Sequence, residues 1–147
     1  MKKTNEIINA SDHAGFGLKQ YIIKSFEKEF VFRDLGPFSD KSVHYPDYAI
    51  KVCKIVEKEK NIKGVLICGS GIGMSMVANR FQNVRAALCS NKKMAELSRK
   101  HNDANILVLG SRLISNEEAI KCYLSFFETK YEGGRHQARL DKFNPIK

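Results

Sequence analysis

The chain has 147 residues, 43% of them hydrophobic and 28% charged, which is typical of one globular domain over residues 1–147. The 25 basic and 16 acidic residues give a net charge of +9, which favours anionic partners, and most lysines are expected on solvated helix faces. The sequence shows no membrane-length apolar run, no signal peptide after Lys3 and no nucleic-acid motif. We expect a cytoplasmic protein that binds neither membranes nor nucleic acid.

Strand-like and helix-like segments alternate along the chain. Short apolar runs predict strands, and apolar residues three or four positions apart predict the helices between them. The predicted strands cover 6–12, 30–36, 63–69, 84–89 and 104–111. The predicted helical stretches cover 18–30, 46–56, 72–81, 92–101 and 115–131. The segment from about Gly133 onward is basic and shows little core-facing periodicity.

This alternation predicts βαβ units and an α/β fold. We expect a Rossmann-like three-layer α/β/α sandwich with a parallel sheet of about five strands. Ligands of such sheets bind beyond the carboxyl ends of the strands. That rule selects the segments that follow four of the strands, namely 12–13, 68–73, 89–91 and 110–112.

A glycine-rich loop follows the third predicted strand, with Gly69, Gly71 and Gly73 directly after Cys68. The loop lacks the G-x-G-x-x-G spacing of dinucleotide sites and the lysine of a P-loop. It is either an anion-binding turn at a helix N-terminus or a structural tight turn. Cys68 favours chemistry, because a thiol there can act as a base or nucleophile. A base beside an oxyanion cradle suits proton abstraction from a carbon alpha to a carbonyl.

The other three cysteines fit an ordinary structural role. Cys53, Cys89 and Cys122 lie in apolar stretches and are expected to be small buried residues. None of the four cysteines forms a C-x-x-C pair. We therefore predict reduced thiols, with neither a zinc site nor a redox motif.

Two further segments carry acid–base groups, and each has a structural alternative. Asp12 and His13 follow the first predicted strand, where Ser11 or Asp12 could instead cap the next helix. His101 lies between a helix and the last strand, where it could be a C-terminal cap or a loop residue.

The basic C-terminal segment carries Arg135, His136 and Arg139 within five positions. On one helical turn these side chains could share a phosphate group. The alternative is a solvated surface tail.

Motifs in the same order along the chain resemble those of the type B ribose-5-phosphate isomerase family, which includes the galactose-6-phosphate isomerase subunits. They are SDHAG (11–15), YPDYA (45–49), CGSGIGMSMVANR (68–80), RAALC (85–89), RKHNDANILVLGSR (99–112) and YEGGRHQAR (131–139). The likeness covers nearly the full chain. Arg80 stands where relatives often carry lysine, and the N-terminal segment is slightly longer than usual; neither departure touches the chemistry.

The resemblance implies an isomerase of the pentose phosphate pathway that interconverts ribose 5-phosphate and ribulose 5-phosphate. The reaction would pass through an enediolate, without metal or organic cofactor. Cys68 would move the proton between C1 and C2, because Met74 stands where some members carry a glutamate base. Ser70 would hydrogen-bond the reacting end of the sugar, and N–H groups around Gly71 and Gly73 would hold the enediolate oxygen.

The resemblance also implies roles for the remaining candidates. His101, with Asp12, would assist opening of the sugar ring, and Tyr45 and Asn102 would contact hydroxyls. The phosphate group would be bound by His13, Arg112, Arg135 and Arg139, with His136 nearby. The family shares each site between two subunits, which implies a homodimer or a tetramer in which His101 and Asn102 could serve the partner's site.

Two alternatives stay open on the sequence. The substrate could be a six-carbon sugar phosphate, such as allose 6-phosphate or galactose 6-phosphate, because the sequence does not fix the pocket size. The protein could also be a non-catalytic sugar-phosphate or nucleotide-binding module that uses the same basic pocket.

Overall fold

A computed structural model describes residues 6–144 of the chain. The strands are β1 (Glu6–Ser11), β2 (Val31–Asp34), β3 (Lys63–Cys68), β4 (Ala86–Leu88) and β5 (Ile106–Gly110). The helices are α1 (Phe16–Phe26), α2 (Tyr45–Lys58), α3 (Ile72–Ala78), α4 (Lys92–Asn102), α5 (Asn116–Glu128) and α6 (Arg135–Leu140). Among these helices of residues 6–144, none combines the length and the apolar character that crossing a membrane requires.

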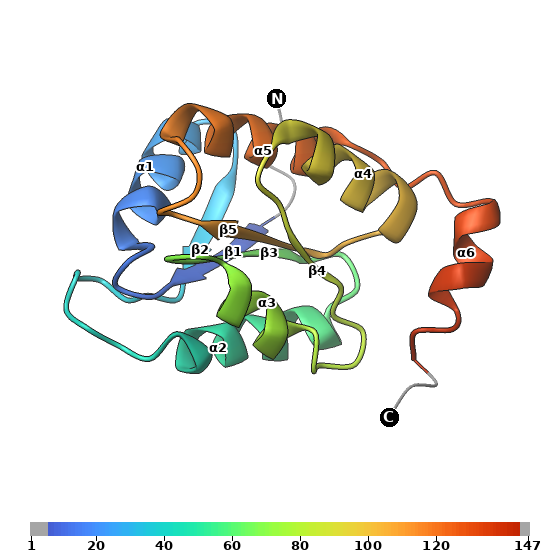
Figure 1. Ribbon diagram of the computed structural model, residues 1–147, viewed down its shortest axis with the longest axis horizontal. Helices are drawn as coiled ribbons and strands as arrows, with labels where there is room; N and C mark the ends of the chain where they lie inside the picture. The colour runs from blue at the N-terminus through green and yellow to red at the C-terminus, as the bar shows by residue number, and fades with distance from the viewer. Residues whose placement is uncertain (1–5, 145–147) are drawn as a thin grey trace.

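The five strands form one parallel sheet in the order β2-β1-β3-β5-β4. Helices α1, α4 and α5 pack on one face, and α2 and α3 on the other (Figure 1). The predicted Rossmann-like three-layer sandwich is therefore confirmed. The strand order reverses direction between β1 and β3, and the crevice outside such a reversal is where open α/β sheets bind ligands.

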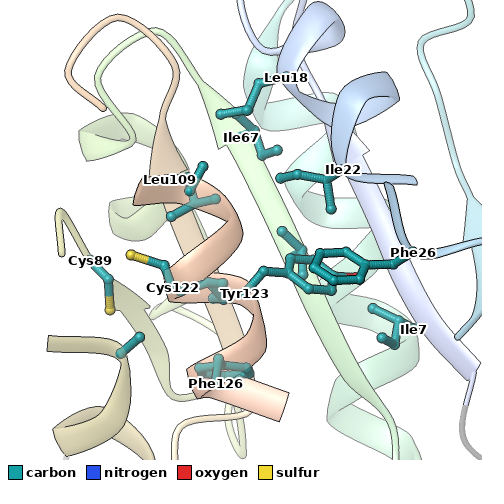
Figure 2. Close-up of a cluster of buried hydrophobic side chains, with 14 of the residues drawn as sticks. Ile7, Leu18, Ile22, Phe26, Ile67, Cys89, Leu109, Cys122, Tyr123 and Phe126 are labelled. Atoms are coloured by element: carbon teal, nitrogen blue, oxygen red, sulfur yellow. The ribbon is translucent and has the colours of Figure 1, made fainter. Parts of the chain in front are cut away.

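Each face of the sheet carries a layer of buried apolar side chains. In the layer under α1, α4 and α5, Phe26 and Tyr123 stack with ring centroids 5.2 Å apart (Figure 2). Ile67 of β3 packs into this layer, whereas its neighbours Leu66 and Cys68 pack into the layer under α2 and α3. A strand covered on both faces in this way is apolar at nearly every position, as its sequence indicated.

Three predicted helices end earlier than their apolar patterns suggested, and one of them is α3, which ends at Ala78 instead of the predicted 81. Helix α1 ends at Phe26, and Phe30, which the pattern placed on its stripe, reaches the same core from the turn before β2. Helix α5 ends at Glu128, three positions before the predicted end at 131. The apolar spacing continues past the end of α1 because Phe30 still faces the core.

The basic segment after Gly133 departs from the expectation that it lacks a core-facing pattern. Arg135–Leu140 form helix α6, and its buried residue is His136. The ring of His136 stacks on that of His101 in α4, with centroids 4.3 Å apart and an interplanar angle of 16°. A helix of 6 residues is too short for a periodic pattern to show. Figure 1 shows α6 at the end of the molecule opposite the loop between β2 and α2.

Candidate active site

Cys68 ends β3 and lies beneath the glycine-rich loop, where its side chain is only 4% exposed. The N–H of Gly71 donates to Cys68 Sγ at 3.1 Å. A hydrogen bond of this kind stabilises negative charge on the sulfur. Gly71 can turn back in this way because its φ is +77°, and an added Cβ would lie 2.5 Å from Leu88 Cδ1. The loop therefore holds a backbone donor against a thiol that is nearly shielded from water.

The other two glycines of the loop give room to large side chains. A Cβ added at Gly73 would collide with the ring of Tyr45, which is the first residue of α2. A Cβ added at Gly69 would stand 2.9 Å from Arg112 Nη1. Tyr45 and Arg112 thus reach the loop from two different elements, as the family motifs implied. The loop brings together a phenol, a guanidinium group and the thiol of Cys68.

Ser70 and Met74 differ in what they can offer to a ligand. Ser70 Oγ accepts the N–H of Ile72 at 3.2 Å, and a serine hydroxyl still carries a hydrogen to donate. Met74 is fully buried in the apolar layer beside Cys68, and its thioether cannot take up a proton. Of Cys68, Ser70 and Met74, only Cys68 has a side chain suited to act as a base.

The loop after β1 adds Asp12 and His13 to the same edge of the sheet. Asp12 Oδ1 accepts the N–H of Gly15 at 2.9 Å and so holds the turn before α1, but the N-cap of α1 is Gly15 and no side chain caps the helix; the expected alternative, a helix cap by Ser11 or Asp12, is therefore wrong. His13 Nδ1 accepts the N–H of Val43 at 3.2 Å. That bond leaves the ring proton of a neutral imidazole on Nε2. His13 therefore links the loop after β1 to the loop before α2.

Lys19 is a functional support that sequence reasoning missed. It is buried, and its Nζ lies 2.7 Å from both Asp34 Oδ1 and the carbonyl oxygen of Pro37. Burial lowers the pKa of Lys19, and the hydrogen bond to Asp34 opposes that effect. These bonds fix the start of the loop that carries Val43 and Tyr45. Nothing local in the sequence separates this lysine from those on solvated helix faces.

His101 and Asn102 lie near the amino ends of the strands, whereas Cys68 lies at their carboxyl ends. Helix α4 ends at Asn102, just before β5 begins, whereas Cys68 pairs with Gly110 at the end of β5. The stretch from Ala104 to Gly110 spans about 20 Å at about 3.3 Å per residue. Within one chain, therefore, Cys68 and His101 are not brought together. The sequence indicated this separation, because His101 precedes β5, whereas the segments expected to bind ligand follow their strands.

The C-terminal candidates gather around His101. His136 Nε2 lies 3.5 Å from Glu132 Oε2, and the two imidazole rings stack. Burial lowers the pKa of His136, and the positive charges of Arg135 and Arg139 act in the same direction. Arg139 Nη1 also donates to the carbonyl oxygen of Arg135 at 3.0 Å. The cluster offers two imidazoles for proton transfer and two guanidinium groups for an anion.

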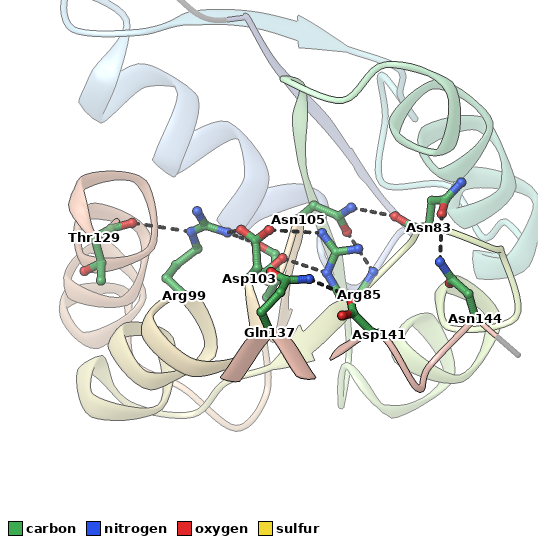
Figure 3. A network of polar contacts seen from close by, with 10 residues as sticks. Asn83, Arg85, Arg99, Asp103, Asn105, Thr129, Gln137, Asp141 and Asn144 are labelled. Carbon is green, nitrogen blue, oxygen red and sulfur yellow. Dashed lines mark hydrogen bonds and ion pairs between the residues drawn. The ribbon is translucent and has the colours of Figure 1, made fainter. Parts of the chain in front are cut away.

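A polar network holds the end of α4 that carries His101 (Figure 3). Arg99 Nη1 donates to Asp103 Oδ1 at 2.8 Å, and Arg85 Nε donates to the carbonyl oxygen of Asp103 at 2.8 Å. Asn144 Nδ2 lies 3.4 Å from Asn83 Oδ1 and ties the chain after α6 to the loop before β4. These contacts fix one edge of the His101 cluster.

A groove of about 1100 Å³ lies between α6 and residues 79–87, with Asn102 in its wall. It borders the edge strand β4. Asn79 blocks that edge, because its Nδ2 donates to the Ala86 carbonyl at 3.0 Å while its Oδ1 accepts the Ala86 N–H at 2.8 Å. The groove lines the His101 side of the molecule, and Cys68 is not part of its wall.

The remaining cysteines behave as expected. All four are free and buried. Burial raises the pKa of Cys53 and of Cys122 to about 12 and that of Cys89 to about 11. These three thiols stay protonated near neutral pH. Cys89 Sγ donates to a carbonyl oxygen, whereas Cys68 Sγ accepts an N–H.

Comparison with known proteins places the chain in a family. The family model described as Ribose/Galactose Isomerase matches residues 7–143. A putative sugar phosphate isomerase of Rickettsia bellii is 48% identical over 142 residues, which is 95% of this chain and 98% of that protein. Ribose-5-phosphate isomerase B of Escherichia coli is 40% identical over 136 residues, which is 92% of this chain and 91% of that protein.

Solved structures agree with the sequence matches. A ribose 5-phosphate isomerase from Thermotoga maritima superposes with a TM-score of 0.93 at 44% identity and covers 97% of this chain and 99% of its own. Ribose-5-phosphate isomerase B from Mycoplasma genitalium, solved with bound ribulose-5-phosphate, gives a TM-score of 0.93 at 41% identity, with 98% of this chain and 97% of its own covered. The chain therefore belongs to the Ribose/Galactose Isomerase family, as its motifs indicated.

Proposed function

We propose that this protein is an aldose–ketose isomerase that interconverts ribose 5-phosphate and ribulose 5-phosphate, a step of the pentose phosphate pathway. The observation that carries the proposal is the Cys68 thiol held against the Gly71 N–H at 3.1 Å in the crevice between β1 and β3. A base beside backbone donors is what an enediolate reaction needs. The ribulose-5-phosphate bound to the Mycoplasma genitalium relative supports the choice of substrate.

Cys68 is proposed as the base that moves the proton between the two carbons. The thiolate takes the hydrogen from C2 of the open-chain aldose, and the C–H electron pair forms a double bond between C1 and C2. The negative charge passes to the oxygen on C1, where the loop N–H groups and Ser70 stabilise it. Return of the proton to C1, and transfer of the hydroxyl proton from the oxygen on C2 to the oxygen on C1, give the ketose. The step is redox-neutral within the sugar and needs no external oxidant or reductant.

The two clusters are proposed to meet across a dimer. One chain holds Cys68 and His101 about 20 Å apart along the sheet, so a complete site calls for a second copy. Around the Cys68 edge, Ile72, Met76 and Leu113 are large apolar side chains that are exposed. A two-fold axis that places this edge on the partner's α6 would complete two equivalent sites at once.

In the proposed site each cluster has its own task. Arg112 and His13 on the Cys68 side would contact the substrate together with Arg135 and Arg139 of the partner copy. The partner's His101 would assist ring opening with Asp12, a proton transfer suited to an imidazole. Tyr45 and the partner's Asn102 would contact hydroxyl groups, and His136 would lie next to the phosphate.

The range of substrates and the location stay predictions. The matched family description names galactose as well as ribose, so six-carbon sugar phosphates are the competitors that an assay must include. Pairing of dimers into a tetramer and a cytoplasmic location are likewise proposals that follow from the family resemblance.

A coupled assay on five- and six-carbon sugar phosphates, with EDTA present, tests the proposal. We expect turnover of ribose 5-phosphate, and a loss in kcat of about 10²- to 10⁴-fold in Cys68→Ala with sugar-phosphate binding retained. Cys89→Ala is the matched control, because its thiol lies in the core, and it should keep wild-type kcat. Saturable binding without turnover by the wild type would instead identify a binding module. Full activity of Cys68→Ala would refute the assigned base.

A further inference from the structure

His101, Glu132 and His136 form a cluster that the isomerase reaction does not require as a unit. Their possible ligand atoms all lie within 4.8 Å of one another. Two imidazoles and a carboxylate are the ligand set of many zinc sites, in which a fourth position stays open to water or substrate. We propose that this cluster binds a borderline transition-metal ion such as Zn²⁺, and that the ion inhibits the enzyme.

The three side chains differ in burial in a way that suits ion entry. His136 is buried and His101 is half-buried, whereas Glu132 is exposed. The backbone holds the group together, because the N–H of Glu132 donates to the Lys100 carbonyl oxygen at 3.1 Å, directly before His101. An ion can approach from the side of Glu132, whose exposed carboxylate already lies 3.5 Å from His136 Nε2. The rings are stacked at an interplanar angle of 16°, so they would have to give up this stacking and tilt apart before an in-plane nitrogen lone pair of each could point at the ion.

Some charged groups around the cluster favour the binding of a cation, and others oppose it. A metal ligand must be a neutral imidazole, and burial together with His101 lowers the pKa of His136. Arg135 and Arg139 face the same imidazole and repel a cation, whereas Glu132 attracts one. The carboxylate is therefore the group on which binding depends most, and its removal should leave two histidines beside two positive charges.

The inhibitory effect rests on the proposed function. In that function His101 transfers a proton during ring opening, and a ligated imidazole has no lone pair left to accept one. The arginines that would hold the substrate phosphate lie beside the same cluster, so a bound ion would lie next to the phosphate position. The ion would act as an inhibitor because it occupies the imidazole nitrogen that accepts the proton.

Calorimetric titration of Zn²⁺ into EDTA-stripped, dialysed protein tests the site without using activity. We expect about one ion per chain in the wild type and an affinity at least about tenfold weaker in Glu132→Gln. Glu128→Gln removes a carboxylate from the exposed end of α5 and should bind Zn²⁺ like the wild type. Co²⁺ should give a spectrum without a thiolate charge-transfer band, which separates this cluster from Cys68.

Activity measurements on the same variants test whether the bound Zn²⁺ inhibits the enzyme. In EDTA, Glu132→Gln should keep wild-type kcat, and added Zn²⁺ should inhibit it at least about tenfold less effectively than the wild type. Equal Zn²⁺ affinity in Glu132→Gln and Glu128→Gln, the absence of stoichiometric binding, or a cobalt–thiolate band would each overturn the metal site. Absence of ribose 5-phosphate turnover in EDTA would instead count against the proposed function alone, since the titration contains no substrate.

Discussion

The two clusters of candidate residues are built in different ways. Around Cys68, the loops after β1, β3 and β5 are joined by short hydrogen bonds, such as Ser111 Oγ to the Ala14 carbonyl at 2.9 Å. Around His101, the ring of His101 in α4 stacks on that of His136 in the short helix α6, and the polar network of Figure 3 holds the end of α4. The first cluster is part of the core, whereas the second depends on a few surface contacts.

This difference shows how one chain can contain every group of a site without completing it. The Cys68 cluster holds the proposed base and its backbone donor, and the His101 cluster holds the imidazoles and two of the arginines that the proposed site would use. Each alone lacks what the other supplies. A symmetric dimer that joins them would make catalysis depend on assembly, and the following experiments test that dependence.

Mixing two inactive variants gives the largest expected effect. Cys68→Ala and His101→Asn should each lower kcat about 10²- to 10⁴-fold, because each damages one half of every site. Mixed dimers, prepared by co-expression with two affinity tags, contain one intact site. Random pairing should restore about a quarter of wild-type activity. Purified mixed dimers no more active than either parent would show that the two clusters do not form a shared site.

Alanine substitutions at two glycines with positive φ, one in each cluster, should lower the free energy of unfolding by different amounts. Gly71→Ala combines a left-handed backbone, at φ +77°, with a Cβ 2.5 Å from Leu88 Cδ1, and should lower the free energy of unfolding by about 3 kcal/mol. Gly133, at φ +67° before α6, has open space around it. Gly133→Ala should cost only about 1 kcal/mol. Urea denaturation followed by circular dichroism measures both, and equal losses would contradict the contrast.

Removing an arginine from each cluster tests whether both hold the same phosphate. Arg112→Ala and Arg139→Ala should each raise KM for ribose 5-phosphate about tenfold or more, because each loses a charge-assisted hydrogen bond. Lys142→Ala removes a positive charge just beyond α6 and should leave KM near the wild-type value. A response to Arg112 alone would mean that α6 is a solvated surface helix, the alternative raised by its sequence.

The smallest expected effect is a shift in the titration midpoint of His136, which NMR of its ring protons can measure. Burial and the neighbouring His101 and Arg135 lower its pKa from the usual 6.5, so the midpoint should lie below 6.5. Because the lowered pKa belongs to the folded state, its contribution to stability is present above pH 6.5 and is lost as the pH falls toward the folded pKa. Arg139→Ala should raise the midpoint, and an unchanged midpoint in that variant would argue against the electrostatic coupling.

Much of the Cys68 cluster was predictable from the sequence. The rule for carboxyl ends of parallel strands selected 12–13, 68–73 and 110–112, and these segments do converge between β1, β3 and β5. It also selected 89–91, which follows the edge strand β4. There Asn91 Oδ1 accepts the Met94 N–H at 2.9 Å and caps α4, a local role that sequence alone did not separate from ligand binding.

The sequence by itself determined the alternation of strands and helices and the set of candidate site residues. Local apolar period and turn residues carry the first, and ordered motifs carry the second. Only the tertiary structure decided the strand order and the formation of α6. These depend on contacts between residues far apart in the chain, such as the stacking of His136 on His101. Local sequence patterns reflect only residues that are close in the chain, so they do not predict such a contact.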